Sequence, residues 1–540
     1  MTTQHPPSRA EPVQSPWLLI LGLIIAMTAW RFGAAALLPV TQDEAYYFDW
    51  ARTLSWGYFD HPPGVALLGI GTWFVPGSAL AARLGGLAAG TLSLIVLARL
   101  YANSGLLRRD DLTLALALLF ASLPALAGGI LTTPDAALML AWALALHEAE
   151  RALAGDRRRW LTVGIAVGLG LLGKYTMMLI GPILLWAILR TDPRALRTPW
   201  PYLGALLAVL VFSPNLWWNA GHDWLALRFQ FGHGFALDAG ALTPANGAAA
   251  KAITHSGPVT LAERAANLGA FVAGQLALWG LIALPLLAAI PRFFRRSATA
   301  DPGPVPATHA RPLLQTAAWF PLGFFALVSL GSEVEANWPA MYLLAAPALL
   351  ARPLRGLRRW VLGAAAANLL LVTLYVYHAA TAALPLPDSQ NRILRETHGF
   401  AALAAVAAGL PGPVYADRYQ LTAMLRFYQP ELAAGQWPGL TRPSEYLVGQ
   451  IAPRVEPNAQ REAFWIITQH PQPPAVGNFT SDTMRTFFDC ADQGLVETAA
   501  PPCARPLHTW FLHHYRPDRP DRPDGSAPPP TEQLSNFFQH

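Results

Sequence analysis

The stretch WLLILGLIIAMTAWRFGAAALLPV (Trp17–Val40), followed by QDEAYYFDWARTLSWGYFDHPP (Gln42–Pro63), sets the character of the chain. The first part is an apolar run that only Arg31 interrupts with a charge. It is long enough to cross a hydrocarbon layer of roughly 30 Å. It is also longer than the apolar part of a cleaved signal peptide, so we predict an uncleaved anchor helix. The second part gathers carboxylates and aromatic rings directly after that helix.

The composition of all 540 residues agrees with this beginning. Hydrophobic residues make up 53% of the chain and charged residues 13%, which is about half the usual charged share of soluble proteins. The mean hydropathy is +0.31. This balance excludes a largely disordered chain, a nucleic-acid-binding module and an ordinary cytosolic enzyme. We therefore predict a polytopic membrane protein whose partners include the lipid bilayer and no nucleic acid.

Eleven apolar runs are candidate transmembrane helices, and the arginines assign their sides. Clusters of arginine begin at Arg108, Arg157, Arg190, Arg292 and Arg352. Because cytoplasmic loops carry an excess of Lys and Arg, eleven spans with the N-terminus inside place every cluster in the cytoplasm. This requires Leu161–Leu189 to be split at Lys174. The runs are Trp17–Val40, Ala79–Tyr101, Leu112–Leu131, Ala136–Leu146, Leu161–Gly173, Tyr175–Leu189, Tyr202–Trp217, Ala265–Ile290, Leu313–Leu330, Trp338–Leu350 and Trp360–Tyr377.

After Tyr377 polar and apolar residues are mixed, as is typical of a soluble domain. Strands are expected at Pro413–Tyr419 and Phe464–Gln469, and helices within Asn391–Ala408 and Gln420–Tyr428. The predicted organisation is an all-α polytopic membrane domain (residues 1–382), a small periplasmic α/β domain (383–515) and a disordered Pro-rich tail (516–540). The chain has only two cysteines, Cys490 and Cys503. Both fall in the outer, oxidising compartment, so we predict a disulfide between them.

The loop Gln42–Pro63 carries the strongest functional signal. Tyr47, Trp50 and Leu54 recur at helical spacing, which predicts a helix over 44–56 that lies in the membrane interface. Asp43 precedes this helix and has two interpretations. It is either an N-cap or a functional carboxylate, since ionisable groups at membrane depth are candidates for function.

Two further charged residues on the outer side have similar alternatives. Asp135 follows Thr132-Thr133-Pro134 and opens a short apolar run. It is a helix cap or a ligand. Lys174 lies between two apolar runs, and the only other lysine of the chain, Lys251, lies in a long loop between runs. The side chain of Lys174 either extends to the interface or offers a compact charge to a phosphate oxygen.

Histidine and carboxylate side chains on several outer loops suggest a divalent metal. The candidate ligands are Asp60, His222 and Glu335. None of them belongs to a motif with diagnostic metal-ligand spacing, so no cofactor is certain. The sequence has neither a phosphate-binding P-loop nor a dinucleotide fingerprint. Soluble nucleotides are therefore not expected as substrates.

The order of these motifs resembles that of the lipid-carrier-dependent GT-C glycosyltransferases. This superfamily includes protein O-mannosyltransferases and the aminoarabinose transferases of lipid A, and the chain is most similar to bacterial family 39, ArnT-like proteins. The motifs are DEAYYFDW (Asp43–Trp50), GYFDHPPG (Gly57–Gly64), TTPDAAL (Thr132–Leu138), GKYT (Gly173–Thr176), SPNLWWNAGHDW (Ser213–Trp224), EANWPA (Glu335–Ala340) and DRYQLTAMLRFY (Asp417–Tyr428).

The resemblance implies a polyprenyl- or dolichyl-phosphate sugar donor and inverting transfer outside the cytoplasm. The acceptor would be lipid A or lipopolysaccharide, another glycan, or a protein. Asp43 matches the catalytic acid of the family, and Asp60 matches a position that is acidic in relatives and can bind metal. His61 departs from the lysine that precedes Pro-Pro in the aminoarabinose enzymes. That departure leaves Lys174 or an arginine as the partner of the donor phosphate.

This chemistry needs a cation beside the phosphate and a base of raised pKa for the acceptor proton. The catalytic candidates are Asp43, Glu44 and Asp135, and the substrate-binding candidates are Lys174, His61, Tyr46, Tyr58, Arg228 and Asn337. The leading hypothesis is a glycosyltransferase of the bacterial inner membrane whose site faces the periplasm. The alternative is a transporter or flippase of lipid-linked sugars, a class that often shows inverted repeats. No such repeat is visible in this sequence.

Overall fold

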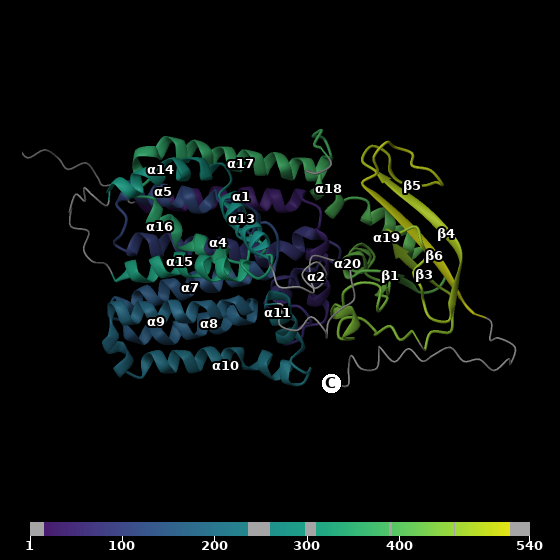
Figure 1. The fold of residues 1–540 in the computed structure, drawn as a ribbon, viewed down its shortest axis with the longest axis horizontal. Coiled ribbons are helices and arrows are strands. Elements are labelled where there is room, and N and C mark those ends of the chain that lie inside the picture. The colour runs from purple at the N-terminus through teal and green to yellow at the C-terminus, as the bar shows by residue number, and fades with distance from the viewer. Residues whose placement is uncertain (1–15, 236–259, 297–308, 388–390, 458, 519–540) are drawn as a thin grey trace, which may run out of the picture.

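Long helices form one part of the molecule and a β-sheet domain lies at one end of them (Figure 1). The computed structural model describes residues 16–235, 260–296, 309–387, 391–457 and 459–518. The mostly helical fold with a small C-terminal sheet domain confirms the predicted fold class. The longer helices are α1 (Pro16–Leu37), α4 (Ala79–Asn103), α7 (Pro134–Leu153), α10 (Trp200–Ala220), α13 (Leu261–Leu278), α15 (Ala310–Ser329) and α17 (Arg358–Thr381).

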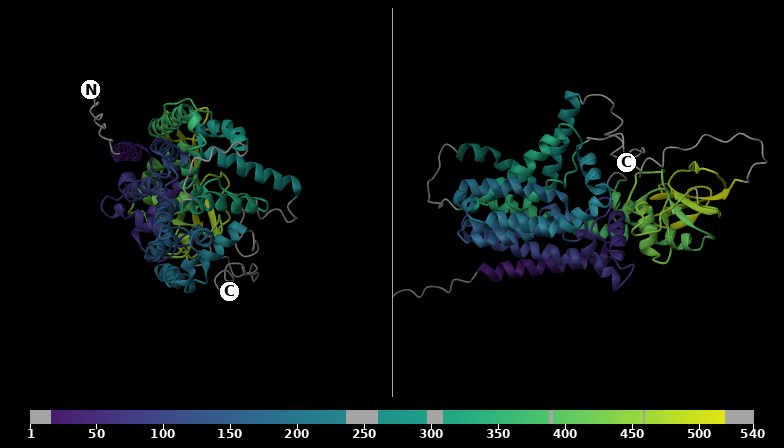
Figure 2. Two further views of the ribbon diagram at one scale, coloured as in Figure 1. Left: turned by 90° about the vertical axis from the view of Figure 1, so that its left-hand side faces the viewer. Right: turned by 90° about the horizontal axis from the view of Figure 1, so that it is seen from below.

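Shorter helices complete the bundle, and a second view shows the sheet domain beyond its end (Figure 2). They are α5 (Arg109–Phe120), α6 (Leu123–Ala127), α8 (Trp160–Gly173), α9 (Ile180–Thr191), α11 (Leu225–Phe235), α14 (Ala283–Arg296) and α16 (Ala346–Leu350). Within the described residues, five helices are individually long and apolar enough to cross a membrane: Trp17–Leu37, Ala79–Asn103, Trp200–Ala220, Ala310–Ser329 and Arg355–Thr381. The count of eleven spans stays a prediction.

The predicted span Ala265–Ile290 is not one straight helix, because the chain bends there by 106° between Leu261–Leu278 and Gly280–Pro291, as in a broken span or a re-entrant loop. Gly280 has a positive φ of 56°, a conformation that glycine adopts without steric cost. The side chain of Asn368 in α17 forms hydrogen bonds with backbone groups at this bend. Its amide oxygen accepts from the Leu281 N–H at 2.8 Å, and its amide nitrogen donates to the Trp279 carbonyl at 2.8 Å.

The first outer helix is α2 (Gln42–Arg52), and its N-cap is Thr41. The Thr41 hydroxyl accepts from the Glu44 N–H while the Glu44 carboxylate accepts from the Thr41 N–H, which is a capping box. Asp43 is therefore inside the helix and is not its cap. The position of this helix relative to the membrane stays a prediction, but one of the three residues on which it rested does not face lipid. Trp50 is fully buried in a cluster that includes Met424 of the sheet domain.

The sheet domain is built on six strands in the order β2-β1-β3-β6-β4-β5. Strand β1 is parallel to β2 and β3, whereas β6 is antiparallel to both β3 and β4. The strands β1 and β3 and the helices α18, α19 and α20 confirm the elements predicted here. The bounds are β1 (Val414–Ala416), β2 (Gly435–Gln436), β3 (Phe464–Thr468), β4 (Phe479–Cys490), β5 (Gly494–Glu497), β6 (His508–Pro517), α18 (Arg392–Thr397), α19 (Phe400–Ala408) and α20 (Tyr419–Tyr428).

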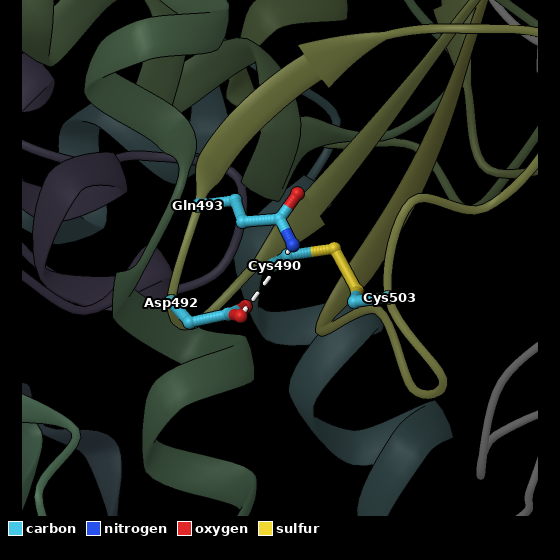
Figure 3. Close-up of a disulfide and its surroundings, with 4 residues drawn as sticks. All are labelled: Cys490, Asp492, Gln493 and Cys503. Atoms are coloured by element: carbon cyan, nitrogen blue, oxygen red, sulfur yellow. Dashed lines mark hydrogen bonds between the residues drawn. A yellow bond between two sulfur atoms is a disulfide. The ribbon is translucent and has the colours of Figure 1, made fainter.

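The disulfide between Cys490 and Cys503 is present, as predicted (Figure 3). Cys490 ends β4, and Cys503 lies in the segment between β5 and β6. The bridge therefore ties the β4–β5 hairpin to the chain that enters the central part of the sheet.

Candidate active site

Asp43 lies where α2 meets the sheet domain. The Tyr419 hydroxyl at the start of α20 donates a hydrogen bond of 3.3 Å to Asp43 Oδ1. Asp43 is exposed to solvent, although protein groups lie close around its carboxyl. Burial, followed by the nearby Glu396 carboxylate, raises the pKa of Asp43 above its ordinary value. These are the properties of a carboxylate that can exchange a proton with a bound molecule.

Arg442 brings a cation from the sheet domain to Asp43. Its Nη1 donates to Asp60 Oδ1 at 2.8 Å, and its guanidinium lies 4.2 Å from the centre of the Tyr419 ring. The charge is close enough to oppose the upward shift in the pKa of Asp43. Sequence reasoning missed Arg442, which lies outside every recognised motif.

Asp60 is occupied by protein contacts rather than available to a metal. One carboxylate oxygen accepts from Arg442, and the other accepts from the Tyr46 hydroxyl at 2.7 Å. The other predicted metal ligands, His222 and Glu335, do not join it. Within the residues that the structure describes, no group of three or more His, Cys, Asp or Glu side chains is arranged to hold a metal ion. Among these residues the three predicted ligands are therefore not brought together, and the metal set stays a prediction.

A second polar cluster brings together three residues that the sequence singled out. Lys174 Nζ donates to Asp135 Oδ1 at 2.8 Å, and Asn337 Nδ2 donates to Asp135 Oδ2 at 3.1 Å. Lys174 adopts an extended backbone conformation that ends α8, so the predicted helix break is confirmed. Its side chain is only 11% exposed. The ammonium thus pairs with Asp135 instead of extending to the interface.

His61 links the two clusters. The charges near enough to influence its pKa include Lys174 and Asp135 on one side and Asp60 and Arg442 on the other. Burial lowers the pKa of His61 to about 4, so the imidazole is neutral at pH 7. Its buried Nδ1 has no hydrogen-bond partner among the described residues. A polar atom in that position is suited to contact a bound molecule.

Glu44 has a structural position, although the sequence grouped it with the catalytic acids. Its carboxylate is fully buried and pairs with Arg83 at 2.6 Å. It also accepts from the Thr132 N–H at 3.0 Å, besides completing the cap with Thr41. These contacts join α2, α4 and the segment before α7. The Arg83 guanidinium is thereby engaged with the Glu44 carboxylate.

Tyr46 and Tyr58, two of the predicted substrate-binding residues, are buried within the protein. Tyr46 is 1% exposed and Tyr58 is 0% exposed. The Tyr46 hydroxyl donates to Asp60 and accepts from the Glu445 N–H at 2.7 Å. Tyr58 stacks on Trp50 with ring centres 4.4 Å apart. Both rings are parts of the core between α2 and the sheet domain.

The remaining predicted residues lie around the site rather than in these clusters. Arg228 on α11 and Glu335 after α15 are exposed. His222 stacks on Trp218 at 4.1 Å, and its Nδ1 lies 2.7 Å from the Trp218 carbonyl oxygen. Neither His222 nor Glu335 makes a contact with Asp135 or Lys174 that would place it in the second cluster.

Glu445 is a further residue that the sequence did not reveal. It is fully buried beneath the loop that carries Asp60. Its carboxylate accepts from the Phe59 N–H at 2.6 Å and from Gln450 Nε2 at 2.7 Å. Burial raises the pKa of Glu445 to about 8. The nearest sequence signal is an isolated acid in RPSEY (Arg442–Tyr446), which has no diagnostic spacing.

Comparison with known proteins agrees with this architecture. Residues 60–218 match the family model described as dolichyl-phosphate-mannose-protein mannosyltransferase. The structure is similar to that of ArnT from Cupriavidus metallidurans in the apo state, with 14% sequence identity, a TM-score of 0.56 and coverage of 92% of this chain and 98% of that one. No curated protein sequence matches the chain.

A second structure of the same ArnT, bound to undecaprenyl phosphate, has 15% identity and a TM-score of 0.55, and the match covers 93% of this chain and 98% of that one. These likenesses show that the chain has the fold of ArnT, and residues 60–218 match one family model. Both findings are in line with the resemblance that the order of the motifs predicts.

Proposed function

We propose that this protein is a membrane glycosyltransferase that transfers a sugar from a polyprenyl-phosphate carrier to an acceptor in the bacterial envelope. The reaction takes place on the periplasmic face of the inner membrane. The observation that carries the proposal is the pairing of two chemically different clusters across His61. One offers a cation, Lys174, and the other offers a carboxylate of raised pKa, Asp43.

Lys174 is the partner of the donor phosphate in this proposal. The phosphate is the leaving group, and its negative charge grows as the bond to the sugar breaks. A nearby ammonium stabilises that charge, because charge-assisted hydrogen bonds are stronger than neutral ones. Asp135 and Asn337 hold Lys174 in place through the contacts described above. The undecaprenyl phosphate in the similar ArnT structure is the type of carrier that this arrangement suits.

Asp43 is the general base of the same reaction. The acceptor oxygen or nitrogen attacks the anomeric carbon, its proton passes to the Asp43 carboxylate, and the carbon–oxygen bond to the phosphate breaks. A single displacement of this kind inverts the anomeric centre. A carboxylate whose pKa is raised toward neutrality accepts the proton more readily. Tyr419 holds Asp43 through its hydrogen bond, and both Tyr419 and the nearby Arg442 charge limit the rise in its pKa.

A reconstituted reaction tests this function against the transporter alternative. The purified full chain is mixed in detergent with a radiolabelled polyprenyl-phosphate sugar and an envelope lipid extract. Detergent micelles enclose no compartment, so transport cannot produce a signal. We expect the label to move to the acceptor and polyprenyl phosphate to be released, both dependent on Asp43. A folded preparation that binds the donor yet never releases polyprenyl phosphate would overturn the proposal.

A further inference from the structure

A hollow of about 180 Å³ lies between the first turns of α1, α5 and α17, at the end of the helical part away from the sheet domain (Figure 1). Both α1 and α17 are candidate membrane spans, and the hollow lies at the beginning of each. Leu19 lines it near the start of the span Trp17–Leu37, and Arg358 lines it near the start of the span Arg355–Thr381. The hollow is therefore placed where the hydrocarbon layer meets the lipid headgroups.

The floor of the hollow is apolar. Leu19, Ile20 and Leu23 of α1 line it, together with Leu116 of α5. Leu19 is 54% exposed, whereas Ile20 is 4% exposed, so the surface leads from the outside of the helices toward their packed interior. Leu23 lies roughly 6 Å, about one helical turn, deeper along α1 than Leu19 does. Such a surface accommodates the acyl chain of a lipid better than a water-soluble ligand.

Two opposite charges lie at the rim of the hollow. Asp110 is in the first turn of α5, and Arg358 is the first residue of α17. Both residues are exposed. Among the side chains that the structure describes, neither of them forms an ion pair. Thr113, one turn after Asp110, adds a hydroxyl group to the same lining.

The neighbouring charges are already paired with each other. Arg355 Nε donates to Asp111 Oδ1 at 2.9 Å, and Arg355 Nη2 donates to Asp111 Oδ2 at 2.5 Å. Asp111 is only 1% exposed. Arg355 is also near enough to interact electrostatically with Asp110, but its guanidinium is hydrogen-bonded to Asp111. Asp110 and Arg358 are therefore the acid and the base that the hollow presents to a ligand.

We propose that this hollow binds a phospholipid of the leaflet away from the sheet domain, and that the lipid carries a phosphoethanolamine headgroup. Arg358 donates hydrogen bonds to the phosphate, because a planar guanidinium matches the geometry of phosphate oxygens. Asp110 accepts a hydrogen bond from the primary ammonium of the ethanolamine. The acyl chains lie against Leu19, Leu23 and Leu116. This inference goes beyond the proposed function, because it assigns a lipid that takes no part in sugar transfer.

The two charges together distinguish this headgroup from those of other common phospholipids. Phosphatidylglycerol offers a phosphate to Arg358 but no cation to Asp110, so the carboxylate would face a second negative charge. Phosphatidylcholine carries a cation, but its quaternary nitrogen has no N–H group that could donate to Asp110. Selectivity of this kind comes from the unfavourable contact with the wrong ligand as well as from the favourable contact with the right one.

Native mass spectrometry of the full chain measures this selectivity directly. The protein is exchanged into a detergent that removes lipid and is then mixed with equal amounts of phosphatidylethanolamine, phosphatidylglycerol and phosphatidylcholine with the same acyl chains. We expect the complex with phosphatidylethanolamine to be at least about tenfold more abundant than either other complex, as for one hydrogen bond to a charged group. Equal abundance of the three complexes would overturn the inference.

Variants at the rim test the two halves of the site separately. R358Q should weaken binding of phosphatidylethanolamine at least about tenfold, because charge-assisted hydrogen bonds to the phosphate are lost. D110N removes the charge that repels an anionic lipid, so phosphatidylglycerol should bind this variant at least as well as phosphatidylethanolamine does. The matched control is R359Q, because Arg359 is also exposed and is not among the lining residues.

Two outcomes with these variants would contradict the proposal. Equal losses of binding in R358Q and R359Q would show a general attraction between lipids and arginine side chains instead of a site. Unchanged preference of D110N for phosphatidylethanolamine would exclude an ammonium contact at Asp110 and overturn the assignment of the headgroup. R359Q itself should bind the lipid like the unaltered protein.

Thermal unfolding keeps the test independent of how stable each variant is. The measured quantity is the rise in melting temperature when phosphatidylethanolamine is added to lipid-free protein in detergent, since a ligand that binds only the folded state stabilises it. The rise should saturate in the unaltered protein and in R359Q, and it should be lost in R358Q. A rise of the same size in R358Q would overturn the inference.

Discussion

Arg442 of the sheet domain donates a hydrogen bond of 2.8 Å to Asp60, a residue that precedes it by 382 positions. The contact joins the C-terminal domain to the loop that follows α2. The same guanidinium covers Tyr419, which in turn contacts Asp43. The sheet domain is therefore part of the candidate site, and its residues are expected to affect the reaction.

Asp43 is the first residue to test. Asp43→Asn should lower the transfer rate by about 10²–10⁴-fold, because an amide cannot take the acceptor proton. Thr41 caps α2, so thermal stability in detergent should be unchanged. The matched control is Glu333→Gln, an exposed acid after α15. Turnover by Asp43→Asn within about twofold of the unaltered protein would remove Asp43 from the mechanism.

Lys174 should matter through its charge. Lys174→Ala is expected to weaken the use of the polyprenyl-phosphate donor by about 10–100-fold, as for the loss of one hydrogen bond to a charged group. Lys174→Arg keeps the charge and should retain more activity. The measurement is KM and kcat for the donor at saturating acceptor. An alanine variant that uses the donor as well as the arginine variant does would exclude a phosphate contact.

Arg442 should set the pH dependence of Asp43. The positive charge lowers the pKa of that carboxyl and opposes the effect of burial. Arg442→Gln removes the charge, so the pKa of Asp43 rises further. The acidic limb of the kcat/KM profile, which reports the ionisation of the free base, should move to higher pH. A reduced rate with an unmoved acidic limb would assign Arg442 a role in packing alone.

The ionisation of Glu445 should make the stability of the folded protein depend on pH. Burial raises its pKa in the folded protein to about 8, whereas an unfolded glutamate has a pKa of about 4.3. Its stabilising contribution is therefore complete below the unfolded value and is lost as the pH rises through about 8. The melting temperature should therefore fall as the pH rises from about 4.3 to about 8, and this contribution should level off above pH 8. Glu445→Gln should flatten this decrease, and an equally steep decrease in that variant would contradict the assignment.

The disulfide should stabilise the sheet domain specifically. Replacement of Cys490 and Cys503 by serine is expected to cost about 2–4 kcal/mol, since the bridge restricts the unfolded chain. Limited proteolysis should show faster cleavage near 490–503, with the helical part unaffected. Unchanged protease resistance of the double variant would show that the strand pairing of β4 and β6 alone holds this region.

Local patterns predicted much of the fold. Apolar runs marked the helices, and Lys174 marked a real break because a charge at the end of an apolar helix is a local signal. Short strands such as β1 were visible as apolar segments between turn residues. Strands β4 and β6 were not predicted. In β4 the exposed and half-buried residues are followed by four consecutive buried ones, so it lacks the simple period of a half-buried strand. In β6 the alternation is interrupted once, and three of its residues are histidines, which are not typical strand formers.

The sequence by itself determined the membrane character, the class of fold, the disulfide and the candidates Asp43, Asp135 and Lys174, because hydropathy, charge and motif order are properties of neighbouring residues. Only the tertiary structure decided how these residues are used. It buried Tyr46 in the core, paired Glu44 with Arg83, and placed Arg442 in hydrogen-bonding contact with Asp60. The physical reason is that a buried polar group must find a partner. When the partner lies hundreds of positions away, no local pattern records it.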